Sequence, residues 1–516
     1  MSIQFYKGRE KMRTWKNAAI LVMSLILFHC AKIKGPEISG TPAEENLKKQ
    51  ILKVLDSEET KNAFWGVSIK RLKDNEPFFI YNEGKSFMPA SNMKLFTTAS
   101  SLVFLGKDFK YETLIYHTGE IDANGVLQGS LAIQGSGDPS ISGRYRQGIT
   151  TEAILNEWCE ALKGKGIKAI EGDIIGDDDY FTDREISGTW QYDNLSDWYT
   201  APSSALSLND NLYQFYVLPG AAVGDKAELE LQLGTSYIRI QNDVITTATA
   251  ARKRISFVRE AEGNRVRVYG HIPLGGAKER VRGCVYNATL FSATLFRDAL
   301  VAGGIAVKGK PRDIDEFDQK EKEGFRGQAK SLHVNMSPPL SEILPIINKP
   351  SQNYYADMLL KTLGKKFRGE GSFDAGEMVV KDFLRLAGAG GIDQFQMIDG
   401  SGLSRKNYVE PRQTVALLEY MVRSPDFPVF YNSLPIGGED GTIKSRFTDP
   451  VVKGNIHAKT GFISNARSLS GYVDDRKGDR WVFCMMCNNW SISASDIDDM
   501  IDKVCIALAE FGGQGM

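Results

Sequence analysis

Ser91 and Lys94 stand three residues apart in the stretch "PASNMKLFTTASSLVFLG". Apolar residues recur at helical spacing after them, which predicts a helix that starts near Ser91 and carries both side chains on one face. A serine hydroxyl becomes a nucleophile when a base takes its proton, and a lysine serves as that base when burial lowers its pKa. By itself the pair is more often a helix cap beside a surface lysine, so the interpretation needs support from elsewhere.

Two further motifs supply that support. Ser351-Gln352-Asn353 precedes a segment of helical periodicity, and Lys459-Thr460-Gly461 ends the strand-like run "NIHAKTG". Ser-x-x-Lys occurs only at Ser91 and Lys-Thr-Gly only at Lys459. A second Ser-x-Asn, at Ser207, lies in a polar run typical of a turn. Each motif alone is weak, but the three in this order are a known set for one group of acyl-transfer enzymes.

With these motifs the chain resembles the class C low-molecular-mass penicillin-binding proteins, which are D-alanyl-D-alanine carboxypeptidases and endopeptidases. The stretches "GSGDPS", "GDIIGDDDYF", "LSLNDN", "DGSGLSRKNYVEP", "LPIGGEDGT" and "HAKTGFISNARSLSGYV" also resemble segments of that family. The long separation between Ser91 and Ser351 matches the extra domains that this class carries between its first two motifs. The middle residue of the second motif is Gln352, where the family usually has Asp, and that position varies.

The resemblance implies a role for each motif residue. Ser91 is the acylated nucleophile and Lys94 its general base, an assignment that is disputed for this superfamily. Ser351 and Asn353 relay a proton and bind the substrate amide. The remaining four residues are expected to bind the substrate: Lys459 and Thr460 hold its terminal carboxylate, Gly461 lets its backbone approach, and the N–H groups of Phe462 and Ser91 form the oxyanion hole.

The elements around these motifs predict an α/β (α+β) catalytic unit, an antiparallel sheet flanked by helices. Residues 40–106 and 320–513 are expected to form this discontinuous domain. Residues 107–319 contain many short alternating strands with Gly-rich turns, and we expect them to be an inserted β-rich region of two modules.

The N-terminus has the pattern of an export signal. Several basic residues precede the uncharged apolar run "AAILVMSLILF", and residues 1–30 are expected to be a signal peptide, with a single-pass anchor as the alternative. The run ends at Cys30, which resembles a bacterial lipoprotein cleavage site, although His29 is larger than the residue usual before that cysteine. We therefore expect an exported, periplasmic protein and keep a lipid anchor at Cys30, tethering it to the membrane, as an open possibility.

Composition excludes other classes. The net charge is −1, from 63 basic and 64 acidic residues, and the sequence has no basic stripe suited to nucleic acid. Five scattered histidines argue against a metal site, and we expect no metal and no cofactor. Asp177, Asp178 and Asp179 could bind a metal, but a solvated turn is the simpler explanation. Cys484 and Cys487 have CxxC spacing inside an apolar run, which favours buried strand thiols.

The sequence therefore predicts a serine D,D-peptidase that acts on peptidoglycan stem peptides through a Ser91 acyl-enzyme and is inhibited by β-lactams. The balance between carboxypeptidase and endopeptidase stays open. The alternatives are a non-hydrolytic peptidoglycan-binding or sensor protein on the same fold, and a serine β-lactamase. A pure binder has no need of Lys94, and a β-lactamase has no need of so long an insertion.

Overall fold

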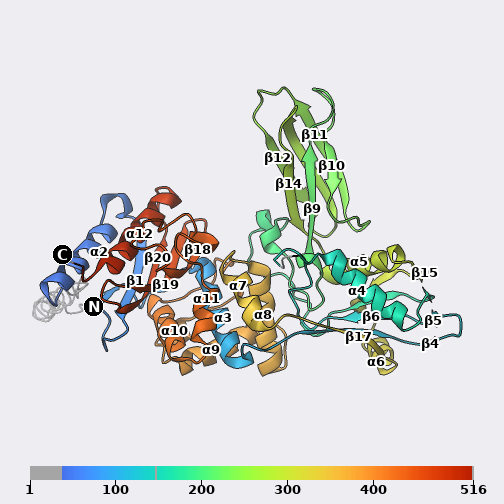
Figure 1. Ribbon diagram of the computed structural model, residues 1–516, viewed down its shortest axis with the longest axis horizontal. Helices are drawn as coiled ribbons and strands as arrows, with labels where there is room; N and C mark the ends of the chain where they lie inside the picture. Colours follow the sequence, from blue (N-terminus) through green and yellow to red (C-terminus); the bar gives the residue numbers. More distant parts are fainter. Residues whose placement is uncertain (1–37, 146–147, 514–516) are drawn as a thin grey trace, which may run out of the picture.

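The computed structural model describes residues 38–145 and 148–513. The predicted signal peptide and Cys30 lie outside these residues. Both ends of the described chain meet in one five-stranded sheet, which lies at the left of Figure 1. Its strand order is β18-β19-β20-β1-β2, and all of its pairings are antiparallel. The strands are β1 (Phe64–Arg71), β2 (Phe79–Tyr81), β18 (His457–Ile463), β19 (Ala466–Asp474) and β20 (Arg480–Asn488).

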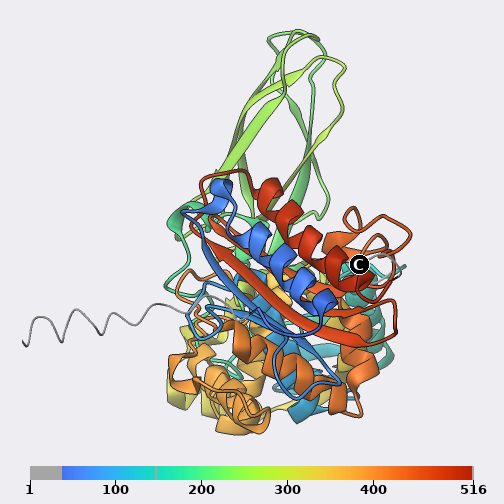
Figure 2. The ribbon, with the colours of Figure 1, turned by 90° about the vertical axis from the view of Figure 1, so that its left-hand side faces the viewer.

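Helices cover both faces of this sheet. On one face lie α2 (Pro42–Leu55) and α12 (Ala494–Glu510), side by side in Figure 2. On the other face lies a helical layer built around α3, most of whose residues are buried. The helices of that layer are α3 (Met93–Leu105), α7 (Leu340–Asn348), α8 (Asn353–Arg368), α9 (Phe373–Leu386), α10 (Pro411–Arg423) and α11 (Phe427–Ser433).

Strand β20 shows why the sheet needs both layers. Trp481, Phe483 and Cys487 pack toward α2 and α12, whereas Cys484 and Met486 pack toward the helical layer. Side chains alternate between the two faces of a strand, so the two thiols of the CxxC sequence point to opposite sides. The prediction of buried strand thiols is confirmed.

Local sequence signals account for the helix boundaries near the start of the described chain. Thr41 caps α2 in a capping box with Glu44, and Pro42 occupies the first helical position. Helix α3 ends at Gly106, whose φ of 82° suits glycine. The predicted antiparallel sheet flanked by helices is confirmed.

The inserted region contains two bodies. The first, at the right of Figure 1, has a five-stranded sheet of order β16-β8-β6-β3-β17 and a four-stranded sheet of order β15-β7-β5-β4, with three helices. Its elements are β3 (Glu112–His117), β4 (Glu120–Ile121), β5 (Val126–Gln128), β6 (Leu131–Gln134), α4 (Thr151–Gly164), β7 (Ala169–Ile170), β8 (Ile174–Asp177), α5 (Ala288–Ala302), β15 (Ala306–Val307), β16 (Pro311–Asp313), α6 (Gln319–Gly327) and β17 (Lys330–Met336).

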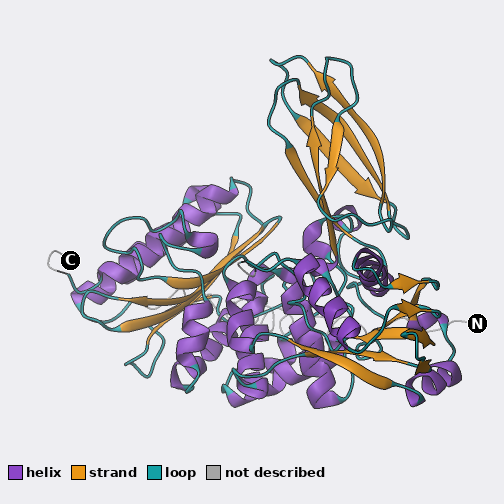
Figure 3. Cartoon of the chain, turned by 45° about the vertical axis from the view of Figure 1, so that its right-hand side comes forward, coloured by secondary structure: helices purple, strands orange, loops and turns teal. Residues whose placement is uncertain are grey.

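The second body is the upright lobe in Figures 1 and 3, which consists of strands and loops. It has two three-stranded sheets, of order β10-β9-β14 and β11-β13-β12. The strands are β9 (Leu212–Leu218), β10 (Glu228–Leu231), β11 (Arg239–Thr247), β12 (Arg254–Arg259), β13 (Arg265–Pro273) and β14 (Glu279–Cys284). One apolar cluster continues through both bodies, from Ile115 on β3 to Val281 on β14.

The insertion differs from its sequence-based description in two respects. Its first body contains parallel strand pairs with α5 packed against them, and α4 packs on α5 and β17, so it is not built of strands alone. Strand β17 pairs with β3, so the sheet of the insertion extends to Met336 and not to residue 319. The charge-rich run before β17 is held by ion pairs with distant residues, which leave no signal in the local sequence. The division into independent folding units stays a prediction.

Arg326 on α6 shows how that run is held. Its guanidinium donates two hydrogen bonds to Asp177, of 2.8 and 2.6 Å, and one of 2.6 Å to Asp179. The Asp177 side chain is 1% exposed, so its charge depends on this partner.

We expect Arg326→Gln to lower the free energy of unfolding by about 3 kcal/mol, because it leaves a buried carboxylate without its counter-charge. Chemical denaturation followed by circular dichroism measures this loss. Lys163→Gln, which removes an exposed pair with Glu160, is the matched control and should change stability by less than about 1 kcal/mol. Equal effects of the two variants would show that α6 is not anchored through Asp177.

Candidate active site

Ser91 lies on a single 3₁₀ turn, Ala90–Asn92, that leads directly into α3. The edge of the sheet holds this turn. Ser468 on β19 donates a 2.7 Å hydrogen bond to the carbonyl of Pro89, and Ala90 has a left-handed φ of 47°. A non-glycine residue in this region is strained, and such strain is typical of functional sites.

Gly461 belongs to the same contact. A Cβ atom at Gly461 would lie 2.1 Å from Ser468 Oγ and 2.5 Å from the Pro89 carbonyl oxygen. A side chain at this position would therefore collide with the Ser91 turn, because strand β18 packs directly on that turn. The resemblance implied that Gly461 makes room for substrate; in this structure it makes room for the backbone that leads into Ser91.

Lys94 is fully buried, with 0% of its surface exposed. Its Nζ lies 3.0 Å from Ser91 Oγ, 2.7 Å from Asn353 Oδ1 and 2.7 Å from the Ser401 carbonyl oxygen. The amide and carbonyl oxygens can only accept hydrogen bonds. A neutral amine therefore gives its two hydrogens to these oxygens, and its lone pair is left facing the Ser91 hydroxyl.

Burial also sets the charge state that this geometry requires. Loss of solvent lowers the pKa of Lys94 from 10.5 to about 7, and the charges of Asp357 and Asp399 partly oppose the shift. The pKa of Asp357 is itself raised well above its usual range by burial and by the charge of Asp399. A base with a pKa near the operating pH suits proton transfer.

The amide of Asn353 is oriented by the inserted region. Its Nδ2 donates a 3.0 Å hydrogen bond to the carbonyl of Tyr199, which leaves Oδ1 to accept from Lys94. Asn353 is the first residue of α8, and Ser351 just before it has a φ of 61°. The carbonyl of Tyr199 thus determines that the oxygen of the Asn353 amide, and not its nitrogen, is directed toward Lys94.

A loop that begins at Asp399 closes the opposite side of Lys94. Both Asp399 oxygens accept hydrogen bonds, from the backbone N–H groups of Gly402 and Ser404 at 2.7 Å and from the indole of Trp190 at 2.8 Å. A Cβ at Gly402 would lie 1.8 Å from the carbonyl oxygen of Ala90, so only glycine fits there. This loop was part of the "DGSGLSRKNYVEP" resemblance, but none of its residues was predicted to lie in the site.

Lys459 is also fully buried, and its Nζ donates hydrogen bonds to Ser351 Oγ at 2.8 Å and to the Thr460 carbonyl oxygen at 2.9 Å. Burial lowers its pKa well below 10.5, and the charge of Lys94 lowers it further. Lys459 does not line the cleft, whereas the hydroxyls of Thr460 and Thr442, which lie 2.7 Å apart, both do.

A cleft of about 790 Å³ opens above Ser91. One wall is formed by the edge strand β18, on which Phe462 is 56% exposed and stacks beneath the Arg467 guanidinium at 4.2 Å. The inserted region supplies the facing wall, and the cleft continues past Thr460 to the first turns of α12. Its main lining residues are Ser91, Gln191, Asn194, Trp198, Tyr199, Ser351, Asn353, Leu403, Arg405, Thr442, Arg446, Thr460, Phe462, Arg467, Ser495, Asp498 and Asp499.

The structure thus brings the residues of all three motifs together. Ser91, Ser351, Asn353, Thr460 and Phe462 line the cleft, and Lys94, Lys459 and Gly461 lie directly behind its surface. The contribution of Gln191, Asn194, Trp198 and Tyr199 from the insertion was missed. They lie in an irregular segment with no periodic signal, and the insertion was expected to lie outside the catalytic unit.

His457, two residues before Lys459 on β18, has a structural role. Its ring stacks on Tyr431 with the centroids 3.8 Å apart, and its Nδ1 lies 3.3 Å from the Tyr431 carbonyl oxygen. Strand alternation places it on the same side as Lys459, but it does not line the cleft.

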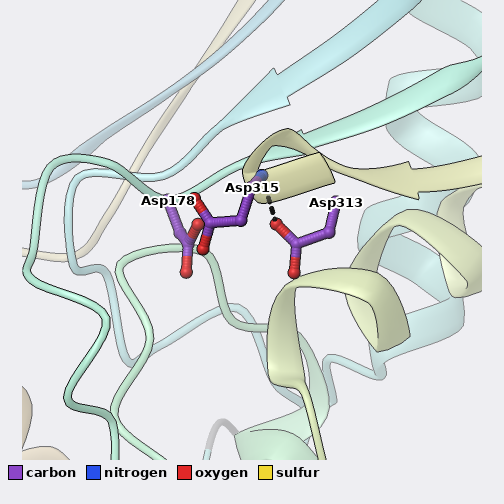
Figure 4. Close-up of side chains that lie close together, drawn as sticks. All are labelled: Asp178, Asp313 and Asp315. Carbon is purple, nitrogen blue, oxygen red and sulfur yellow. Dashed lines mark hydrogen bonds between the residues drawn. The ribbon is translucent and has the colours of Figure 1, made fainter. Parts of the chain in front are cut away.

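The solvated turn predicted for Asp177, Asp178 and Asp179 is wrong, because Asp177 and Asp178 are buried. Asp178 accepts hydrogen bonds from Ser204 and Thr289 of 2.9 and 2.7 Å. Its carboxylate lies close to those of Asp313 and Asp315, as Figure 4 shows. Burial raises the pKa of Asp178 to about 7, and Asp313 and Asp315 add to the shift.

Comparisons with known proteins show which family the chain belongs to. Residues 47–510 match the model of the D-Ala-D-Ala carboxypeptidase 3 (S13) family. A D-alanyl-D-alanine carboxypeptidase of Actinomadura sp. (strain R39) is 29% identical over 92% of this chain and 87% of its own length. The D-alanyl-D-alanine carboxypeptidase DacB of Haemophilus influenzae is 27% identical over 83% of this chain and 85% of its own length.

A solved structure shares the fold. The crystal structure of penicillin binding protein 4 from Haemophilus influenzae superposes with a TM-score of 0.76 at 24% identity, covering 91% of this chain and 99% of that chain. A second structure of that protein is a complex with a β-lactam, and it superposes with a TM-score of 0.72 at 24% identity, covering 90% of this chain and 100% of that chain.

The chain therefore has the fold of penicillin binding protein 4 of Haemophilus influenzae. The chain belongs to the D-Ala-D-Ala carboxypeptidase 3 (S13) family, and it is a serine-type D,D-peptidase. The predicted resemblance and function are confirmed at this level.

The pKa of Lys94 leads to a prediction about pH. Only the neutral amine can take the Ser91 proton, so the second-order rate of acylation by a labelled penicillin should rise about tenfold per pH unit below pH 7 and level off above it. Rates measured between pH 5 and 9, with circular dichroism to confirm that the protein stays folded, test this. A rate independent of pH across that range would remove Lys94 as the base.

Proposed function

We propose that the chain hydrolyses the D-Ala-D-Ala end of peptidoglycan stem peptides through an acyl-enzyme on Ser91. The observation that supports this most directly is the environment of Lys94. Its two acceptor-only partners leave the amine lone pair for the Ser91 hydroxyl, and burial lowers its pKa to about 7.

The reaction then divides into two steps. Lys94 takes the Ser91 proton as Oγ attacks the carbonyl carbon of the penultimate D-Ala, and the N–H groups of Ser91 and Phe462 bind the oxyanion that forms. Ser351, which accepts a hydrogen bond from Lys459, gives its hydroxyl proton to the leaving D-Ala nitrogen, and the proton taken up by Lys94 replaces it, which restores the neutral amine. Water hydrolyses the ester in the second step, with Lys94 again as base.

The terminal carboxylate of the substrate is placed against Thr460 and Thr442. Their hydroxyls line the cleft, while Nζ of Lys459 is buried behind it. We assign Lys459 to Ser351: its Nζ donates a hydrogen bond to the Ser351 hydroxyl and holds it in place. Asn353 holds both Lys94 and the amide of the substrate.

A β-lactam presents the same groups as the D-Ala-D-Ala end, so we expect it to acylate Ser91. Ser91→Ala should abolish the covalent adduct with a labelled penicillin. Lys94→Ala should slow its formation by about 10²-fold or more, the usual range for loss of a general base. Intact-mass spectrometry measures both. An undiminished adduct on Ser91→Ala would contradict the assignment, and near-normal labelling of folded Lys94→Ala would make that lysine a structural residue.

Endopeptidase activity is a second candidate function, and the extent of the cleft supports it. The cleft continues past Thr460 to Ser495, Asp498 and Asp499 on α12, which is more space than a single departing D-Ala fills. A cross-linked stem peptide has a longer leaving group. Separate digestion of uncross-linked pentapeptide and of cross-linked dimer, with Ser91→Ala as the blank, distinguishes the two activities.

We also propose that the protein is exported to the periplasm, as the basic and apolar N-terminal segment indicates. Within the part of the chain that the structure describes, every helix is too short or too polar to cross a membrane. A lipid on Cys30 would tether the enzyme to the membrane that carries its substrate.

In cells that make the wild-type protein, we expect it in the membrane fraction, and Cys30→Ser should release it as an exported soluble enzyme. Fractionation with activity labelling measures the distribution, and mass spectrometry of the mature N-terminus is the second measurement. A mature N-terminus downstream of Cys30 would contradict lipid attachment.

A further inference from the structure

Three arginines surround a second cavity, of about 330 Å³, in the inserted region. Arg280 and Arg282 stand on the same face of β14, because they are two residues apart on a strand. Arg144 reaches the cavity from the loop before α4. Gln214 and Tyr216, the cross-strand partners of the two β14 arginines on β9, line the same cavity.

These guanidinium groups carry more positive charge than their surroundings neutralise. Among the described residues, neither Arg280 nor Arg282 has a carboxylate within 4.0 Å, and Arg144 has only Asp210, at 3.3 Å. Glu152, an exposed side chain, is the acidic residue in the lining of the cavity. Burial lowers the pKa of Arg282, and the charges of Arg144 and Arg280 lower it further, which shows that the cations are held close together.

One of the three arginines also has an unused hydrogen-bond donor. Nη1 of Arg144 is buried without a hydrogen-bond partner. The remaining polar groups include the side chains of Thr150 and Thr151, where α4 begins, and a glutamine pair, Gln214 and Gln232. Guanidinium groups bind carboxylates and phosphates through paired hydrogen bonds, so an anion is the ligand that this set of donors matches.

Aromatic side chains connect this cavity to the catalytic cleft. The guanidinium of Arg282 lies over the ring of Trp198, 4.8 Å from its centroid, and Trp198 lines the cleft. Arg144 is followed by Tyr145, whose hydroxyl accepts a 3.0 Å hydrogen bond from Gln352 of the Ser351-x-Asn353 motif and whose ring packs on Tyr355. A ligand in the arginine cavity is therefore one side chain away from groups that position the substrate.

We propose that Arg144, Arg280 and Arg282 form an exosite that binds a carboxylate of a peptidoglycan peptide strand while its D-Ala-containing bond lies at Ser91. This rests on the proposed function. Stem peptides carry carboxylates beyond the one at the scissile end, and a cross-linked substrate carries more of them than a short peptide. The exosite thus selects long, polymeric substrate over small peptides through binding and without any part in the chemical step.

The test compares two substrates on the full-length protein. One is a cross-linked tetrapeptide dimer, and the other is a diacetylated tripeptide that ends in D-Ala-D-Ala and fills the cleft alone. The double variant Arg280→Gln/Arg282→Gln should raise KM for the dimer about ten- to hundredfold, as loss of charge-assisted hydrogen bonds predicts, with kcat unchanged. KM for the tripeptide should not change. Arg267→Gln, an exposed arginine of the same lobe that pairs with Asp243, is the matched control.

Two results would overturn the exosite: no change in KM for the dimer, or an equal change for both substrates, which would mean that the variant disturbs Trp198. Binding of the dimer to Ser91→Ala by calorimetry keeps the test separate from catalysis, so a failure of the proposed reaction leaves the exosite testable. Amidation of the carboxylates of the dimer should remove the dependence on arginine. Inorganic phosphate that binds more tightly than the dimer, with the same dependence on Arg280 and Arg282, would assign the cavity to a phosphate and refute the peptide.

Discussion

The proposed mechanism depends on keeping one amine, that of Lys94, neutral. Lys94 lies in the interior, where an ammonium ion is disfavoured. Its polar neighbours are groups whose hydrogen bonds a neutral amine can complete. Two oxygens that can only accept take its hydrogens, and the lone pair remains for Ser91. If a solvated carboxylate replaced either oxygen, it would stabilise the charged form, raise the pKa of Lys94 and remove the base.

Each of these two oxygens is held in place by a different residue of the inserted region. The Asn353 amide is oriented by the carbonyl of Tyr199, and the loop that carries the Ser401 carbonyl is organised by Asp399, which accepts a hydrogen bond from Trp190. Tyr199 and Trp190 both belong to the inserted region. The insertion therefore contributes to the candidate site: it orients the hydrogen-bond partners of Lys94 and builds one wall of the cleft, besides carrying the arginine cavity.

The sheet contributes positioning of a different kind. Strand β18 packs on the turn that carries Ser91, and Gly461 makes the close approach possible. The neighbouring Lys459 lies behind the cleft and is bonded to Ser351. Two buried lysines thus stand behind two serine hydroxyls, and the charge of Lys94 lowers the pKa of Lys459. In the proposed reaction, this arrangement couples the proton acceptor of the first step to the group that returns a proton to the leaving nitrogen.

The sequence alone determined the elements at both ends of the chain and the identity of the motif residues. Capping residues, strand alternation and the helical spacing after Ser91 are local signals, and three short motifs in order are specific enough to define the reaction. Only the tertiary structure decided how these residues are placed. It shows that Lys459 is buried and that Gly461 faces the Ser91 turn. It also shows that β17 pairs with β3 and so belongs to the sheet of the insertion. Those outcomes depend on contacts between residues hundreds of positions apart. Irregular segments such as the one around Trp198 have no periodicity from which their place beside Ser91 could be inferred.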